Sequence, residues 1–137
     1  MKTDIQNRKD VNILVCSFYD EIRKDDLLGP IFNKMIPNED WPAHLEKLTD
    51  FWETNLFGVA KFKGNPTQKH LLTDAAFNHM ITQKHFDHWL SIWKKTIDNL
   101  YEGDLATRAQ MAAYSIAHIQ NIVINRNKPA NKKEQLN

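Results

Sequence analysis

Cysteine is nearly missing from this chain of 137 residues, which contains Cys16 alone. A single cysteine excludes an internal disulfide and a zinc site built from cysteines. No apolar run approaches the roughly 20 residues that a membrane-spanning helix needs, and residues 1–4 lack the apolar stretch of a secretory signal. Four glycines and five prolines are few for an all-β protein with many tight turns. We therefore expect a reduced, cytoplasmic protein with no membrane segment.

The charges are almost balanced, with 18 basic and 17 acidic residues and a formal net charge of +1. This balance provides no basic footprint for nucleic acid, so we expect no nucleic-acid partner. Apolar residues make up 42% of the chain, which is too many for a disordered protein. We expect a single domain over residues 1–137, with a folded core at about 10–125 and a flexible tail at 127–137.

Apolar residues recur at helical spacing along most of the chain, and no segment makes a strong case for a strand. We predict helices at about residues 10–23, 41–58, 82–101 and 104–126. A turn or short helix is predicted at 27–32, and residues 64–67 are typical of a turn that begins a short helix. Helices of this length with short connections indicate an all-α fold.

Three aspartates precede or begin the apolar patterns, and each is a predicted N-cap: Asp10, Asp40 and Asp104. The last helix has an apolar stripe that we expect to face the core, at Leu105, Ala109, Ala112, Ile116, Ile119 and Val123. Residues 71–80 fit no element clearly.

Six histidines are generous for this length, and they lie at positions 44, 70, 79, 85, 88 and 118. Most single histidines on helices are hydrogen-bonded surface residues. His85 and His88 are spaced so that they can share a metal face, yet paired Glu-x-x-His and His-Glu-x-x-His motifs are absent. His70 differs because it follows the turn at Gly64-Asn65-Pro66. A locally fixed backbone suits an imidazole that presents one ring nitrogen to a metal while an acceptor holds the other N–H.

Aromatic residues that carry a polar donor lie on apolar helical faces, among them Tyr19, Trp52 and Trp89. The pattern alone makes the tryptophans core residues and places Tyr19 at the core rim, with its hydroxyl in water. If Tyr19 and Trp89 instead share a buried pocket, their O–H and N–H groups would hold a ligand with partial negative charge.

Several strings in this order make the chain resemble a group III truncated haemoglobin over about residues 10–125. The matching strings are Phe18-Tyr19, Leu28-Gly29-Pro30-Ile31-Phe32, Trp41-Pro42-Ala43-His44, Phe51-Trp52, Gly64-Asn65-Pro66-Thr67-Gln68-Lys69-His70 and His85-Phe86-Asp87-His88-Trp89-Leu90. The resemblance implies a shortened globin, a two-over-two helical sandwich around haem b.

Roles follow from the resemblance, residue by residue. His70 would be the proximal ligand of the haem iron. On the distal side, Tyr19 would supply a hydroxyl, His44 would act as a gate and Trp89 would direct its indole N–H into the pocket. The resemblance further implies a set of residues that line the haem pocket: Phe32, which packs on the haem plane, Leu48, Trp52, as wall or packing residue, and Phe86.

The chain departs from the pattern of the group in one stretch. More residues separate His70 from the string at 85–90 than the group usually has, and the extra stretch contains His79. His79 is therefore the alternative proximal ligand. We prefer His70 because the Gly-Asn-Pro turn before it belongs to the motif.

Two distal donors predict slow release of O2, which favours conversion of NO to nitrate or activation of peroxide over bulk transport. We expect O2, NO or CO as ligands, an unidentified reductase or other electron donor, and a monomer. Two rival hypotheses remain. One is a haem-free helical interaction or sensor domain, and the other is a non-haem metal protein that uses His85 and His88.

Overall fold

The computed structural model describes residues 2–59 and 82–126, and every regular element in these ranges is a helix. The predicted all-α class is confirmed for these ranges, whereas the predicted turn at 64–67 and the unassigned stretch at 71–80 lie outside them. The elements are α1 (Arg8–Lys24), α2 (Gly29–Met35), the 3-10 helix η1 (Asn38–Asp40), α3 (Trp41–Phe57), α5 (Gln83–Leu100) and α6 (Asp104–Arg126).

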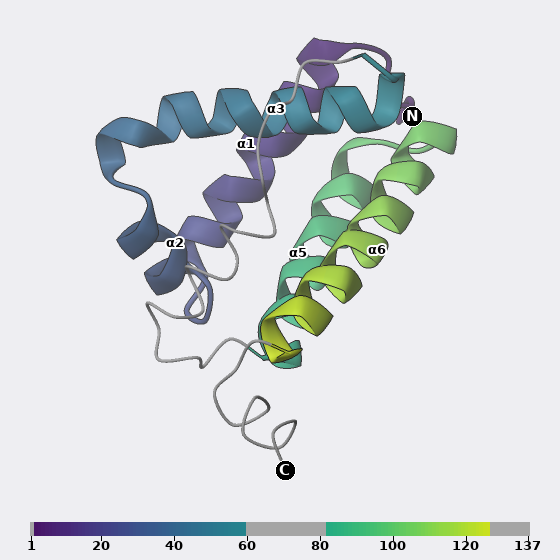
Figure 1. Cartoon of the computed structure of the whole chain (residues 1–137). Helices are drawn as coiled ribbons and strands as arrows, with labels where there is room; N and C mark the ends of the chain where they lie inside the picture. Colours follow the sequence, from purple (N-terminus) through teal and green to yellow (C-terminus); the bar gives the residue numbers. More distant parts are fainter. Residues whose placement is uncertain (1, 60–81, 127–137) are drawn as a thin grey trace.

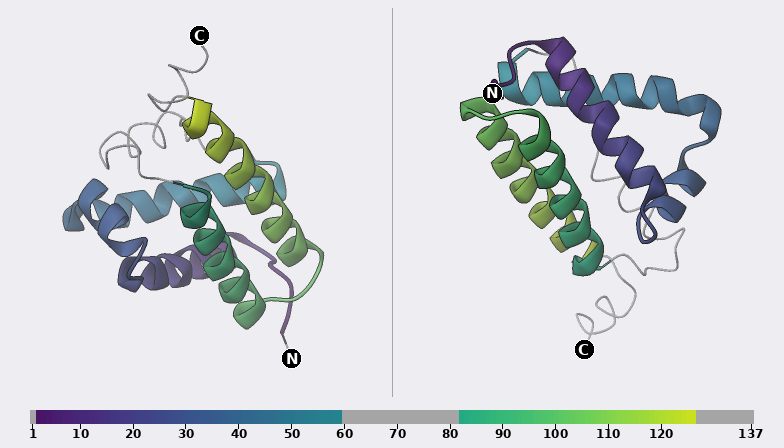
Figure 2. Two further views of the ribbon diagram at one scale, coloured as in Figure 1. Left: turned by 90° about the horizontal axis from the view of Figure 1, so that it is seen from below. Right: turned by 180° about the vertical axis from the view of Figure 1, so that it is seen from behind.

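Two pairs of helices are arranged in two layers (Figure 1). In one layer α1 crosses α3. In the other layer a short turn follows α5, and α6 runs back antiparallel to it. The views from below and from behind show the same two layers (Figure 2). The layers meet mainly where α1 packs on α5, with a smaller contact between α3 and α6. This is the two-over-two arrangement that the sequence resemblance implies.

The core lies where α1 meets α5. Phe18 of α1 and Trp93 of α5 are its largest fully buried side chains, and their ring centroids are 4.8 Å apart in an edge-to-face contact. The indole N–H of Trp93 donates a hydrogen bond of 3.1 Å to the carbonyl oxygen of Ala109 in α6. Because the polar end of the indole is satisfied inside the core, Trp93 is buried at no cost from an unpaired donor.

Arg8 ties the start of α1 to three carboxylates of α3. Its guanidinium nitrogens lie 2.6 Å from Glu46 Oε1, 2.7 Å from Asp50 Oδ1 and 2.8 Å from Glu53 Oε1. The hydrogen bonds to Asp50 and Glu53 raise the pKa of Arg8, so its charge is permanent. These contacts fix α3, the helix that carries His44, against α1.

The predicted caps are wrong in detail. The side chain of Asn7, not of Asp10, caps α1 by accepting from the backbone N–H of Asp10. Asp40 precedes α3 but makes no capping hydrogen bond through its side chain. Asp104 lies within α6, whose first N–H groups are bound by a residue from the other end of the chain, Asp4.

The buried stripe of α6 is also shifted from the predicted one. Ala109 is buried as expected, whereas Ile119 is 55% exposed. The remaining predicted positions, Leu105, Ala112, Ile116 and Val123, are half-buried at the edges. The buried face consists mainly of alanines, with two polar residues and one isoleucine near the C-terminal end: Ala106, Ala109, Ala113, Ala117, Gln120, Asn121 and Ile124. Alanines on this face allow α6 to lie close to α5.

Replacing Asp4 by alanine should lower the free energy of unfolding by about 1 kcal/mol, because the carboxylate caps α6. Its oxygens accept from the N–H groups of Leu105 and Ala106, both at 2.9 Å, and the N–H of Ile5 at 2.8 Å. Urea unfolding of both proteins at neutral pH measures the difference.

Acid should remove the same contribution from the wild type. Burial raises the pKa of Asp4, but the backbone donors outweigh it, so the pKa lies below its ordinary value of 3.8. A carboxyl with a lowered folded pKa stabilises the protein above its unfolded pKa, and this stabilisation is lost as the pH falls through the folded pKa. An Asp4→Asn variant keeps an acceptor oxygen and should lack this pH dependence. Equal stability of wild type and Asp4→Ala at neutral pH would contradict the assignment.

Candidate functional site

Tyr19 is the centre of an aromatic cluster formed by three helices. Its side chain is 6% exposed on the inner face of α1. Its ring centroid lies 5.8 Å from Phe32 of α2, 5.8 Å from Trp41 and 6.1 Å from His44, both of α3. The prediction from the helical pattern alone, a hydroxyl in water, is therefore wrong, because α2 and the start of α3 cover this part of α1.

The Trp89 side chain of α5 is placed to donate to the Tyr19 hydroxyl, and this interaction lowers the pKa of the hydroxyl. An indole nitrogen can only donate, so the tyrosine oxygen accepts. Burial raises the pKa of Tyr19 far more than the hydrogen bond from Trp89 lowers it. The hydroxyl therefore keeps its proton at any physiological pH, and among the described residues it has no acceptor for that proton. The structure brings together the two donors that the sequence singled out.

His44 and Trp41 flank the same cluster on α3. The imidazole of His44 is half-buried and meets the Trp41 ring edge to face, with centroids 5.4 Å apart. Trp41 is 3% exposed, and its buried Nε1 has no hydrogen-bond partner in the described part of the chain. The guanidinium carbon of Arg23 lies 4.6 Å from the centroid of its ring. Sequence reasoning assigned no role to Trp41, although its place three residues before His44 puts both residues on one face of the helix.

Three of the predicted pocket residues lie at the margin of the core, where they remain half-buried: Phe32, Leu48 and Phe86. Phe86 packs against Ile31 of α2 and Ile124 of α6. Trp52 is different, because it is 3% exposed and stacked on Trp93 with centroids 4.6 Å apart. Of the two roles that the sequence left open for Trp52, packing matches this position.

The two proximal candidates, His70 and His79, both lie outside the described residues. The two histidines proposed to bind a non-haem metal, His85 and His88, each make a hydrogen bond to another residue. His85 Nδ1 accepts from the backbone N–H of Thr82 at 3.0 Å in a capping box, and His88 Nε2 lies 2.6 Å from Asp25 Oδ1. Within residues 2–59 and 82–126, no cluster of three or more histidine, cysteine or acidic side chains is placed to hold a metal. The structure thus gives the non-haem hypothesis no support.

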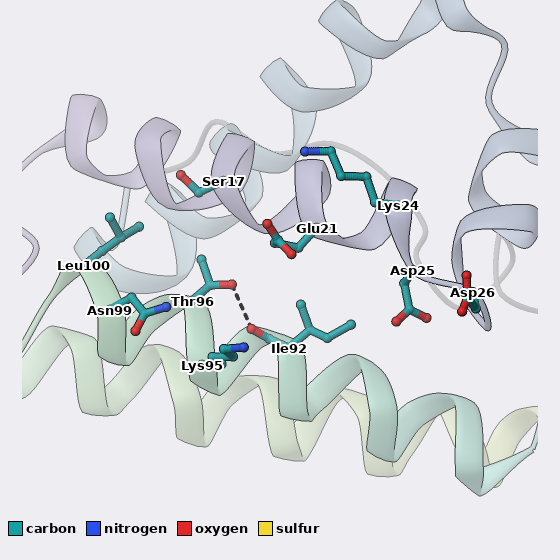
Figure 3. A pocket seen from close by; sticks show the side chains of 10 residues that line it. All are labelled: Ser17, Glu21, Lys24, Asp25, Asp26, Ile92, Lys95, Thr96, Asn99 and Leu100. Carbon is teal, nitrogen blue, oxygen red and sulfur yellow. Dashed lines mark hydrogen bonds between the residues drawn. The ribbon is translucent and has the colours of Figure 1, made fainter.

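A groove of about 660 Å³ opens between α1 and α5 (Figure 3). None of the predicted site residues lines it, and its walls carry charged and polar side chains rather than aromatic ones. The lining residues are Ser17, Glu21, Lys24, Asp25, Asp26, Ile92, Lys95, Thr96, Asn99 and Leu100. The groove is therefore separate from the cluster around Tyr19.

The described residues around Tyr19 can accommodate a flat apolar group together with a ligand that carries negative charge. The half-buried faces of Phe32, Leu48 and Phe86 offer apolar contact area. The Tyr19 O–H and the buried Trp41 N–H are donors without an acceptor in the described structure. Unpaired donors in a dry site are costly unless a ligand satisfies them.

Two helix pairs with a buried tyrosine and tryptophan between them define a small helical protein of the globin type. The family model of bacterial-like globins matches residues 4–125. Group 3 truncated hemoglobin ctb from Campylobacter jejuni is 33% identical over 129 residues, which cover 90% of this chain and 95% of the relative. A crystal structure of group III truncated hemoglobin from Campylobacter jejuni superposes with a TM-score of 0.78 at 32% identity, covering 90% of this chain and 95% of that one.

The chain belongs to the bacterial-like globin family, as a truncated haemoglobin of group III. The predicted family and fold are thereby confirmed. Membership supports haem-based binding of small ligands. Within the described ranges, no helix has the length and apolarity required to cross a membrane.

Proposed function

We propose that the chain holds haem b at the cluster around Tyr19 and binds O2 or a related diatomic ligand there. Bound haem would supply an iron that takes O2, NO or CO and leaves partial negative charge on bound O2. His70 is the proposed proximal ligand, with His79 as the alternative. Phe32, Leu48 and Phe86 are the proposed apolar contacts of the porphyrin, which their half-buried positions support.

The observation that carries this proposal is the buried Tyr19 hydroxyl, which interacts with Trp89 and donates to no acceptor among the described residues. A donor that already accepts a hydrogen bond is polarised and donates more strongly. Tyr19 would therefore donate directly to the ligand, while Trp89 would orient the hydroxyl and strengthen it. A hydrogen bond to a charged, buried acceptor contributes about 1.5–3 kcal/mol.

Such stabilisation slows the release of O2, because about 1.4 kcal/mol corresponds to a tenfold change. A protein that releases O2 slowly is a poor carrier, so we propose redox chemistry on O2, NO or peroxide rather than bulk transport. Conversion of NO to nitrate and cleavage of the peroxide O–O bond both develop negative charge that the Tyr19 hydroxyl can stabilise. Either reaction also requires an electron donor, which we propose is a separate reductase. His44, half-buried beside Tyr19, is the proposed gate.

Titration with hemin, followed by visible absorption, tests the cofactor and the proximal ligand together. We expect saturable binding of one haem per chain by the wild type. Replacing His70 by alanine should weaken haem retention at least about 100-fold, since the loss of a metal ligand costs several kcal/mol. His79→Ala serves as the matched control and should retain haem like the wild type.

The outcomes separate the alternatives. Loss of haem in His79→Ala but not in His70→Ala would move the proximal role to His79. A wild-type protein that folds cooperatively yet takes up no haem would reject the proposed function and favour the haem-free interaction or sensor domain.

A further inference from the structure

His88 connects α5 to the end of α1. Its Nε2 lies 2.6 Å from Asp25 Oδ1, and because a carboxylate can only accept, the histidine nitrogen donates. Asp25 is the C-cap residue of α1, and its side chain is 18% exposed. The two residues are 63 positions apart in the chain. Their hydrogen bond is a tertiary contact between the helix that carries Trp89 and the helix that carries Tyr19.

Asp25 also organises the turn that leads to α2. Its second oxygen accepts from the backbone N–H groups of Leu27 at 3.0 Å and Leu28 at 2.9 Å. Burial raises the pKa of Asp25, but the bond from His88 and the backbone donors outweigh it, so the pKa is lowered and the carboxylate stays charged. One side chain thus links α5 both to the end of α1 and to the start of the element that carries Phe32.

The hydrogen bond also lies at one end of the groove between α1 and α5, since Asp25 is one of the lining residues (Figure 3). Along this face polar side chains, not packed aromatic rings, separate the two helices. Elsewhere between the two helices Phe18 packs against Trp89, with ring centroids 5.1 Å apart. The contact through His88 therefore joins the two helices at a point outside these aromatic contacts.

We propose that His88 is a positioning residue that keeps the Trp89 N–H on the Tyr19 hydroxyl by fixing α5 against the end of α1. His88 directly precedes Trp89 on α5, so a shift of the helix at His88 moves the indole with it. The consequence for ligand release rests on the proposed function, whereas the consequence for the indole does not. His88 thereby acquires a role distinct from metal binding.

Stability alone is a poor measure of this role, because partly exposed ion pairs add little to it. The direct readout is hydrogen exchange of the Trp89 indole proton, measured by NMR in the haem protein with CO bound. His88→Leu should speed this exchange about tenfold, because the indole leaves its acceptor more often. The Trp93 indole proton, bonded to Ala109 in the core, is the internal reference and should not change.

Lys94→Leu is the matched control. Lys94 Nζ lies 2.7 Å from Asp98 Oδ2 in an exposed pair that stays within α5, so its loss leaves the contact with α1 intact. Exchange of the Trp89 proton should remain at the wild-type rate in this variant. His88→Gln retains a side-chain donor for Asp25 and should restore most of the protection that His88→Leu loses.

Three outcomes decide the proposal. Faster exchange at Trp89 alone supports it, and the release of O2 should then also speed up, by about threefold. Unchanged exchange at Trp89 in His88→Leu overturns it. Equal acceleration at Trp89 and Trp93 overturns it as well, because it would mean a general loss of stability. If the chain takes up no haem, exchange in the protein as purified still tests the positioning role, so failure of the proposed function is recognised separately.

Discussion

Replacing Tyr19 and Trp89 together by phenylalanine should speed the release of O2 on the order of a hundredfold. In the proposed site Tyr19 donates to the ligand and Trp89 polarises the Tyr19 hydroxyl, and the double variant keeps aromatic rings while it removes both donors. One polarised hydrogen bond to a charged, buried acceptor, worth about 1.5–3 kcal/mol, accounts for an effect of this size. Stopped-flow measurement of O2 dissociation gives the rate, and the absorption spectrum confirms that the variant is fully loaded with haem.

The single variants separate the contributions of Tyr19 and Trp89 to the rate of O2 release. Tyr19→Phe removes the direct donor but frees the Trp89 N–H from its acceptor, so part of its effect should be offset. Trp89→Phe leaves Tyr19 as a donor that nothing polarises. We therefore expect each single change to have a smaller effect than the double change and the two effects to be non-additive. Release from the double variant within about threefold of the wild type would refute the role of the pair.

Replacing Trp93 by alanine should lower the free energy of unfolding by about 3–5 kcal/mol. Its side chain is 1% exposed and lies between Trp52 and Trp89, with ring centroids at 4.6 Å and 5.8 Å. Alanine leaves a cavity where the two helix layers meet and removes both stacked contacts, each of which adds to the area buried. Equilibrium unfolding in urea measures the change, with far-UV circular dichroism as the signal.

Trp93→Phe separates packing from hydrogen bonding. Phenylalanine keeps an aromatic ring against Phe18 but cannot donate to the Ala109 carbonyl, so a smaller loss of about 1–2 kcal/mol is expected. A loss below about 1 kcal/mol in Trp93→Ala would contradict the view that this residue holds the two layers together.

Hydrophobic periodicity predicted the four long helices α1, α3, α5 and α6, because amphipathic helices in a small protein repeat their buried face at regular spacing. It did not predict η1, and residues 27–32 were predicted only as a turn or short helix. It located the helix ends less well. Asn7 caps α1 through a side chain three residues before the expected Asp10, and α6 is capped by Asp4 from the opposite end of the sequence. No local pattern reveals a cap that depends on tertiary contact.

The register of α6 shows a second limit. Periodicity favoured the large side chains, including Ile119, which is 55% exposed. The face that is buried is rich in alanine instead, because α6 approaches the aromatic residues of α5 closely and leaves little room. Which side of a helix is buried depends on the bulk of its partner, and a single helix does not encode that information.

The site could be predicted in part. Resemblance brought Tyr19, His44 and Trp89 together, and all three lie around one cluster. The pattern alone placed the Tyr19 hydroxyl in water because the residues that cover it, Phe32 and Trp41, come from other elements. His88 was read as half of a metal pair, since nothing in the sequence connects it to Asp25.

The most direct test of the distal donors is the C–O stretching frequency of the haem protein with CO bound, recorded by infrared spectroscopy for the wild type and for the Tyr19→Phe, Trp89→Phe double variant. Donors that point at the ligand oxygen draw electron density onto it and weaken the C–O bond. We predict a lower frequency in the wild type than in the double variant. Equal frequencies in the two proteins would show that neither donor reaches the ligand and would contradict the account.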